Sequence, residues 1–202
     1  MFVVKSKPWF FNFPRYEWDN VWFTSDIHAF HKNLCVGSSR WTDKSGCRNF
    51  PDEQVMTKKL IENFNSCIKK EDLLIDLGDH AFGDKAHRDF VRKSLNVKHY
   101  YRIFGNHDDH YRHGEYKDLF SQQLDYAEIT VNGQLICMSH YPMYHWKDML
   151  KGSIHLFGHV HGSVVGVGKN MDVGVTDDLM PYSAQQILDI MATRTLVTRT
   201  EI

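Results

Sequence analysis

The chain has 202 residues, of which 42% are hydrophobic and 24% are charged, and this is the composition of a folded globular protein. Its 24 basic and 25 acidic side chains give a formal net charge of −1, which excludes a strongly charged surface committed to nucleic acid or to an anionic membrane. No apolar run approaches the roughly 18 residues that a membrane-spanning helix needs. The length predicts a single domain over residues 1–202.

The first segment of the chain is rich in aromatic residues, namely Trp9, Phe10, Phe11, Phe13, Tyr16 and Trp18. We expect residues 1–20 to pack on the domain and cover part of its core. A surface for a partner or for a second copy of the chain is the alternative, and the sequence does not indicate the oligomeric state. The segment lacks the pattern of a secretion signal and the four cysteines form no close pair. These features predict a cytoplasmic protein with reduced thiols.

Short apolar runs that predict β-strands alternate along the chain with segments of helical periodicity. The expected strands cover residues 21–24, 73–77, 100–104, 134–139 and 154–157. Asn132 and Gly133 lie between the apolar runs 128–131 and 134–138 and predict a two-residue hairpin turn. Strands and helices interleaved in this way, with one hairpin, favour an α/β layered fold with a mixed sheet.

Three segments have the periodicity of helices. The clearest follows Pro51 and runs to residue 68, with apolar residues at three- and four-residue steps. Proline suits the first turn of a helix, and the two acidic residues that follow it suit the positive end of the helix dipole. Residues 86–95 and 183–191 are the other two predicted helices, and in the first of these we expect Phe90 to face inward.

Each expected strand, apart from the first arm of the hairpin, runs into a block of polar residues suited to metal coordination. In chain order, the blocks contain Asp26 and His28, then Asp79, then Asn106, His107 and Asp108, then His140, and finally His159 and His161. The carboxyl ends of strands in an α/β sheet meet at one edge, where ligand sites assemble. Two divalent cations about 3.5–4 Å apart need a shared carboxylate, with imidazole and oxygen donors on each side. The blocks therefore supply candidate metal ligands at one rim.

In order, these blocks give the motifs D-x-H, G-D, G-N-H-D, a single His and G-H-x-H. The ordered set resembles the calcineurin-like metallophosphoesterase superfamily, and the similarity to its small single-domain bacterial and phage members extends from residue 21 to residue 191. The resemblance implies a four-layer α/β/β/α sandwich with mixed sheets. The chain departs from the family pattern at His80, which follows Asp79, and in a longer stretch over residues 38–49.

The resemblance also implies a role for each candidate ligand. For a first divalent ion it implies the ligands Asp26, His28 and His161. For a second ion it implies the ligands Asn106, His140 and His159. Asp79 is expected to bridge the two ions. Mixed nitrogen and oxygen ligation without thiolate suits Mn²⁺, which we favour, and also Fe, Zn²⁺ or Ni²⁺.

Four further residues are candidates for catalysis and substrate binding. The resemblance implies that His107 is the catalytic histidine beside the phosphate and that Asp108 orients it. His31 and Arg48 are candidates for holding the substrate phosphate, because arginine makes bidentate contacts with phosphate and His31 follows soon after the first motif. An ordinary solvated surface position is the alternative for both.

We therefore expect a dinuclear metal-dependent phosphoesterase in which a metal-activated hydroxide attacks a phosphate ester in line. A phosphodiester is favoured, since the chain has no evident cap domain, and the expected partner is a small phosphoester or nucleotide. One alternative is a phosphomonoesterase that acts on a nucleotide or a protein. The alternative outside the enzymes is a metal-stabilised scaffold for protein interactions.

Overall fold

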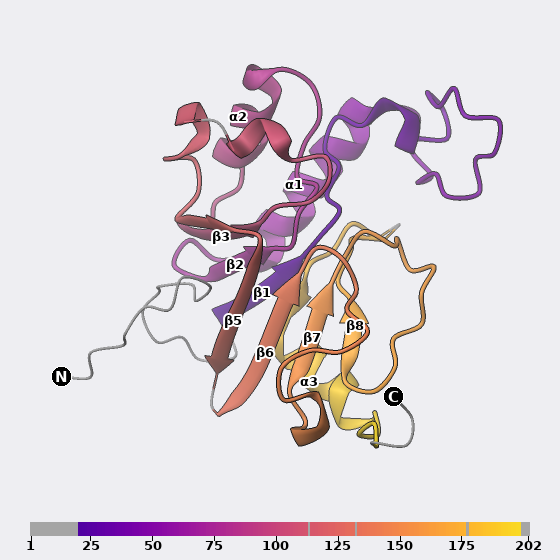
Figure 1. Cartoon of the computed structure of the whole chain (residues 1–202). Coiled ribbons are helices and arrows are strands. Elements are labelled where there is room, and N and C mark those ends of the chain that lie inside the picture. Colours follow the sequence, from indigo (N-terminus) through magenta and orange to yellow (C-terminus); the bar gives the residue numbers. More distant parts are fainter. Residues whose placement is uncertain (1–19, 113, 132, 177, 199–202) are drawn as a thin grey trace.

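The computed structural model describes residues 20–198 except 113, 132 and 177, and it contains two β-sheets that share one core (Figure 1). In the first sheet, four parallel strands lie in the order β4-β3-β2-β1. They are β1 (Val21–Thr24), β2 (Leu73–Asp76), β3 (His99–Ile103) and β4 (Gln122–Leu124). The short strand β9 (Tyr182–Ser183) pairs antiparallel with β1 at the edge of this sheet.

The second sheet has the order β5-β6-β7-β8. Its hairpin joins β5 (Tyr126–Val131) and β6 (Gln134–Ser139), which pair antiparallel. β7 (Ile154–Phe157) and β8 (Asn170–Asp172) continue the sheet in parallel. Both sheets mix parallel and antiparallel pairs, which confirms the predicted mixed-sheet α/β fold.

The core between the two sheets is built by alternate residues of the facing strands. Phe23 and Ile75 from the first sheet and Ile136 and Leu156 from the second are all fully buried in it. The third helix, α3 (Ala184–Ala192), adds further apolar side chains to the same core. It begins at Ser183, whose side chain accepts the N–H of Gln186 in a capping box that stabilises the first turn.

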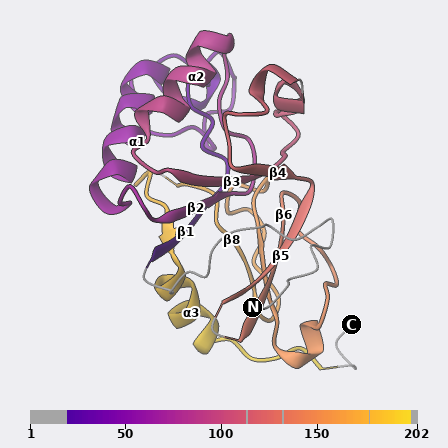
Figure 2. The ribbon, with the colours of Figure 1, turned by 90° about the vertical axis from the view of Figure 1, so that its left-hand side faces the viewer.

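Two helices cover the outer face of the first sheet, and Figure 2 shows them beyond that sheet on the side away from the second one. They are α1 (Glu53–Cys67) and α2 (Lys85–Ser94). Phe64 of α1 and Val91 of α2 pack with Leu74 and Tyr100 of the sheet. The prediction that Phe90 faces inward is wrong, because the buried stripe of α2 runs through Val91 and leaves Phe90 53% exposed.

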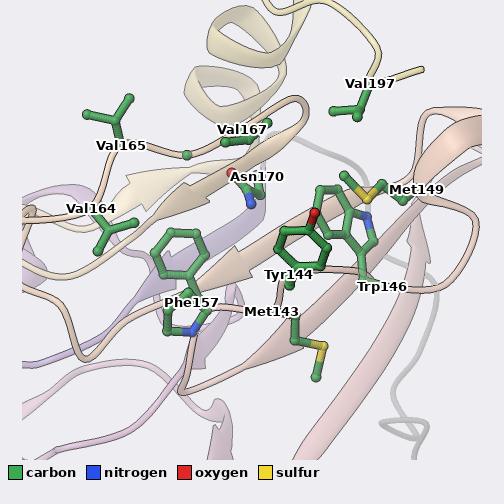
Figure 3. A pocket seen from close by; sticks show the side chains of 12 residues that line it. Met143, Tyr144, Trp146, Met149, Phe157, Val164, Val165, Val167, Asn170 and Val197 are labelled. Atoms are coloured by element: carbon green, nitrogen blue, oxygen red, sulfur yellow. The ribbon is translucent and has the colours of Figure 1, made fainter. Parts of the chain in front are cut away.

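The outer face of the second sheet is covered by the chain that connects β6 to β7 and by part of the C-terminal segment. Trp146, Met149 and Val197 form a small apolar cluster there with Cys137 of β6. Beside this cluster lies an apolar pocket of about 280 Å³, lined also by Phe157 and by valines of the loop after β7 (Figure 3).

All of the strands and helices expected from the sequence are present, and their ends shift by only one or two residues. The strands that the sequence did not indicate are the short ones, β4, β8 and β9. The expected packing of residues 1–19 and the turn residue Asn132 lie outside the described residues. Among the helices that the structure describes, none is long and apolar enough to cross a membrane.

Substitution of two phenylalanines tests how α1 and α2 pack on the first sheet. Phe64→Ala removes a fully buried ring, and we expect it to lower the free energy of unfolding by about 3–5 kcal/mol. Phe90→Ala removes a largely exposed ring and is expected to cost less than about 1 kcal/mol. Urea denaturation of both variants provides the comparison. Equal losses would contradict an α2 that buries Val91 and exposes Phe90.

Candidate metal centre

The structure brings the seven predicted metal ligands together at the carboxyl edge of the two sheets. Each lies in the loop that follows a strand: β1, β2, β3, β6 or β7. The first two loops run side by side, since the N–H of Asp26 donates to the carbonyl of Gly78 and the N–H of His28 to that of Asp79, both at 2.9 Å. The loops after two neighbouring parallel strands are thus held in register with each other.

The backbone of these loops is unusual for residues other than glycine. Five of the seven candidate ligands have a positive φ: Asp26 (53°), His28 (49°), Asp79 (61°), His159 (72°) and His161 (48°). Such left-handed conformations are rarely adopted by L-residues with a side chain. They turn alternate side chains of the D-x-H and H-x-H motifs toward the same rim.

Asp26, His28 and His161 form the first group of ligand atoms. His28 Nε2 lies 3.6 Å from Asp26 Oδ1 and 3.3 Å from His161 Nε2. His161 Nε2 is also 3.7 Å from Asp26 Oδ1. All three atoms are close enough to bind one ion, and they belong to the residues that the family resemblance implies for the first site.

Asp79 lies between this group and the second one. Its Oδ2 is 3.6 Å from His28 Nε2 and 3.5 Å from His140 Nε2. Asp79 and His140 can also share an ion with Asp26, which the sequence had assigned to the first site alone. The position of Asp79 therefore agrees with the bridging role expected for it, while Asp26 is open to both groups.

Asn106 joins the two remaining histidines of the second group. Its Oδ1 lies 2.9 Å from His140 Nε2 and 2.8 Å from His159 Nδ1. The other nitrogen of the His140 ring lies 2.9 Å from the carbonyl of Leu77, which fixes the orientation of the imidazole. The structure thus brings Asn106, His140 and His159 together, and their binding of a metal ion stays a prediction.

Two glycines of the motifs are required because the carboxylates of Asp79 and Asp26 lie very close to the backbone at these positions. A Cβ on Gly105 would lie 2.1 Å from Asp79 Oδ1, and a Cβ on Gly158 would lie 2.4 Å from Asp26 Oδ2. Both distances are far shorter than any van der Waals contact. The glycines therefore allow the backbone to pass directly behind the ligand side chains.

Burial and neighbouring charges set the protonation of the centre. Burial lowers the pKa of His28 to about 4, so this imidazole is neutral at pH 7 and can bind a cation. Burial acts against ionisation of Asp26 as well, but His28 and the other nearby histidines outweigh it and hold the pKa of Asp26 well below its usual value. In contrast, burial raises the pKa of Asp79 to about 7, although His140 acts in the opposite direction.

These residues fit divalent metal ions. Asp26 Oδ1 is buried without a hydrogen-bond partner among the described residues, although it lies within reach of two imidazole nitrogens. The ligand atoms are carboxylate and amide oxygens and imidazole nitrogens, a set that suits Mn²⁺, Fe or Zn²⁺. A cation would satisfy the unpartnered oxygen and neutralise two acidic side chains that lie close together.

The Asp108 carboxylate is engaged by backbone N–H groups and an arginine, with no hydrogen bond to the His107 ring among the described residues, contrary to the expected orienting role. It is fully buried and accepts the N–H groups of Gly105, Asp79 and His80 at 2.8, 2.7 and 3.2 Å. It also forms an ion pair with Arg102. Burial raises the pKa of Asp108, but the Arg102 charge and the backbone donors reverse this and lower it to about 2. Asp108 therefore holds the loops after β2 and β3 together.

The predicted substrate-binding residues lie in different surroundings. The ring centroid of His31 lies 4.1 Å from that of Phe82 and 5.5 Å from that of His28, so His31 borders the centre, and its substrate-binding role stays a prediction. Arg48, in contrast, is only 4% exposed. Its guanidinium donates to the carbonyls of Asp26, Ile27 and Val175 at 2.6, 2.8 and 3.1 Å. Arg48 therefore braces the backbone beneath the first motif, which corrects the expectation that it holds phosphate.

His80, the departure from the family pattern, points away from the rim. Its ring is fully buried, with Nδ1 3.1 Å from Asp76 Oδ2 and 3.0 Å from the Tyr100 hydroxyl. Asp76 also accepts the N–H of Gly78 at 2.9 Å. This network lies below the loop that carries Asp79, so His80 does not line the substrate side of the centre.

Asp172 is a supporting residue that the sequence reasoning missed. Its Oδ2 accepts the N–H of Gly162 at 2.8 Å and its Oδ1 that of Gly174 at 2.7 Å. It thereby fixes the end of the loop that carries His159 and His161. The sequence pattern that could have indicated Asp172 was weak, because β8, the strand that ends at this residue, has only three residues.

The pKa of Asp79 leads to a prediction about stability. A carboxyl whose pKa rises on folding destabilises the folded protein as the pH increases from its unfolded value toward its folded value of about 7. We therefore expect metal-free Asp79→Asn to be more stable than the metal-free wild type at pH 8, by up to about 4 kcal/mol, and by less at pH 5.

Thermal unfolding after chelation and dialysis measures this difference. Mn²⁺ is expected to raise the Tm of the wild type and to have little effect on the variant, because the shared carboxylate is lost. A metal-free variant less stable than the wild type at pH 8 would contradict the burial of an ionised Asp79.

Comparison with known proteins finds relatives over the part of the chain that carries this centre. The family model described as calcineurin-like phosphoesterase matches residues 20–163, which contain every candidate ligand. The Gene 66 protein of Mycobacterium phage D29 is 30% identical over 173 residues, covering 72% of this chain and 80% of the phage protein. A crystal structure of the Aquifex aeolicus protein of unknown function AQ665 superposes with a TM-score of 0.62 at 23% identity, covering 84% of this chain and 98% of that one.

The Aquifex aeolicus structure shows a shared fold, and the family and phage matches extend the likeness to the sequence itself. The matched region begins at β1 and ends just after the last histidine motif, so it includes the whole rim with its seven candidate ligands. This chain belongs to the calcineurin-like phosphoesterase family.

Proposed function

We propose that the protein is a phosphoesterase that binds two divalent metal ions, with Mn²⁺ as the first candidate, and hydrolyses a phosphodiester. The observation that supports this most directly is the position of Asp79. One carboxylate oxygen lies 3.6 Å from a histidine of the first ligand group and 3.5 Å from a histidine of the second. A shared carboxylate between two sets of neutral donors is the arrangement that a pair of divalent ions needs.

Divalent ions bound here would supply Lewis acidity, lowering the pKa of water and stabilising negative charge on phosphoryl oxygens. The chain itself keeps two of the ligands in the required protonation state, because His28 is neutral and Asp26 is ionised at pH 7. The Asp108 contacts hold the loops after β2 and β3 in one position. These contacts preorganise the centre, so little rearrangement is needed when the substrate arrives.

His107 is the residue that we assign to proton transfer. Its backbone N–H donates to Asp79 Oδ1 at 2.9 Å, which anchors it beside the centre. Its ring lies 5.6 Å from the His28 ring and 5.1 Å from Phe82, and its nitrogens make no hydrogen bond with a described residue. An exposed imidazole left unpartnered at the rim can donate a proton to the leaving oxygen of a phosphoester.

A phosphodiester is favoured over a monoester by the openness of the rim. Asn106 and His107 are exposed, and His161 is 40% exposed, so the edge leaves room for organic groups on both sides of a phosphate. The alternatives are a phosphomonoesterase and a non-catalytic scaffold, and the three functions differ in metal content, substrate preference and turnover.

The first experiment measures metal content and hydrolysis together. After reconstitution with Mn²⁺, elemental analysis is expected to find about two ions per chain. Bis(p-nitrophenyl) phosphate should then be hydrolysed faster than p-nitrophenyl phosphate, and chelation should abolish both reactions. Faster cleavage of the monoester would support the phosphatase alternative. Bound metal without any turnover would support the scaffold.

The second experiment tests His107. His107→Ala is expected to keep its metal content and its Tm but to lose about 10²–10⁴-fold in kcat on an alkyl phosphodiester, which is the usual contribution of general acid catalysis. The loss should be smaller with a nitrophenyl leaving group, since that group needs less protonation.

His145→Ala is the matched control, because this histidine is also exposed but lies outside the centre. Its kcat should equal that of the wild type. Wild-type turnover by the His107 variant on the alkyl ester would refute the assignment of the proton donor.

A further inference from the structure

A second cavity opens directly beside His107. It has a volume of about 340 Å³, and its lining includes Asn106, His107 and His110 from the loop after β3, Phe82 from the loop after β2, and Arg88 from α2. Asn106 and His107 also belong to the metal centre. Any substrate bound there with its phosphate near His107 therefore has this cavity within reach of one of its organic groups.

Arg88 is the most unusual residue of the cavity. It is only 8% exposed, and its Nε is buried without a hydrogen-bond partner. Its Nη1 donates to the Tyr116 hydroxyl at 3.1 Å, and the guanidinium lies 5.8 Å from the Tyr111 ring. Among the residues that the structure describes, no carboxylate forms an ion pair with it. Burying a guanidinium with no counter-ion is costly, so an anion from outside the chain would stabilise this arrangement.

Arg102 provides an internal comparison. Its guanidinium lies 3.9 Å from the same Tyr111 ring, and it is fully buried. Its charge is compensated by the ion pair with Asp108. Two buried arginines therefore lie against the same aromatic ring, but the structure supplies a carboxylate only to the one that does not line this cavity.

The remaining charged groups of the cavity do not replace that carboxylate. Asp109 belongs to the lining, but its side chain is 87% exposed and its Oδ1 lies 3.7 Å from Arg112 Nε. Arg112 is itself paired with Asp125. His107, His110 and Asn106 contribute groups that can donate hydrogen bonds to an anion.

From this geometry we infer that the cavity is a subsite for a second phosphate of the substrate. The inference rests on the proposed function, because the first phosphate is the one that lies at the metal centre. A guanidinium binds phosphate oxygens by charge-assisted hydrogen bonds, and its planar fork matches their geometry. The preferred substrate is then a phosphodiester that carries a further phosphate nearby, as in an oligonucleotide, rather than a diester with one charge.

Matched dinucleotides separate the two substrate types. The dinucleotide TpT has one phosphate, while pTpT and TpTp carry a second phosphate on the 5′ or the 3′ side. We expect the wild type with Mn²⁺ to cleave at least one of the doubly phosphorylated compounds with a kcat/KM about 10-fold or more above that for TpT. Equal kcat/KM values for all three would overturn the subsite and leave the phosphodiesterase proposal intact.

In Arg88→Gln, the ratio of kcat/KM for the doubly phosphorylated compound to that for TpT should fall to near one. Arg88→Lys should restore part of this ratio, because lysine keeps the positive charge but lacks the planar guanidinium. Arg92→Gln is the matched control, since Arg92 lies one turn further along α2, is half-buried and donates to the carbonyl of Leu119 without lining the cavity. It should keep the wild-type preference. An Arg88→Gln variant that keeps the preference would also overturn the subsite.

Two further measurements test the subsite if Arg88→Gln does not fold or if the protein hydrolyses no phosphoester. If Arg88→Gln does not fold, His110→Ala at an exposed position should still reduce the preference, and an unchanged preference would count against the subsite. If no phosphoester is hydrolysed, the proposed function fails, and calorimetry of chelated protein with thymidine 3′,5′-bisphosphate decides on the subsite alone. Binding that is lost in Arg88→Gln and partly kept in Arg88→Lys supports the subsite, and absence of binding to the wild type overturns it.

Discussion

The carboxylate of Asp108 joins the two loops that shape the centre. It accepts N–H groups from Gly105 on its own loop and from Asp79 and His80 on the neighbouring one. Without these contacts, three buried backbone donors would lack a partner, and the side chain of Asp79 would lose its fixed position between the two ligand groups. The charge of Asp108 is in turn tolerated in the interior because Arg102 is paired with it. The geometry of the metal centre therefore depends on an ion pair below the rim.

Much of the fold and of the metal centre could be predicted from the sequence because both depend on local patterns. Apolar runs of four to six residues marked β1, β2, β3, β6 and β7, and a polar block followed each of them. Once the ends of parallel strands are known to meet at one edge, the ligands in these blocks must converge there. The periodicity of α1 was equally clear, since its buried side has a full stripe of apolar residues.

The residues that were missed or misplaced depend on tertiary contacts that no local pattern records. Arg48 looked like a phosphate ligand because of its type, but its surroundings of three backbone carbonyls exist only after the loops have folded. Asp108 stands next to His107 in the sequence, yet the turn between them sends the two side chains in different directions. Arg88 lies in a predicted helix of mixed composition, and only the folded chain shows that it is buried without a carboxylate.

The left-handed conformations of the ligand residues have a consequence for how this chain can change over evolutionary time. Each of these residues costs on the order of 1 kcal/mol relative to glycine, which adopts a positive φ without steric strain. At the exposed His161, selection for metal binding keeps a side chain where selection for stability alone would favour glycine. A descendant released from metal binding would thus gain stability by replacing His161 with glycine, whereas Asp26 and His28 are buried and Asp26 also accepts the N–H of His159. A glycine at position 161 in a related sequence would mark the loss of the centre, even where the fold is fully retained.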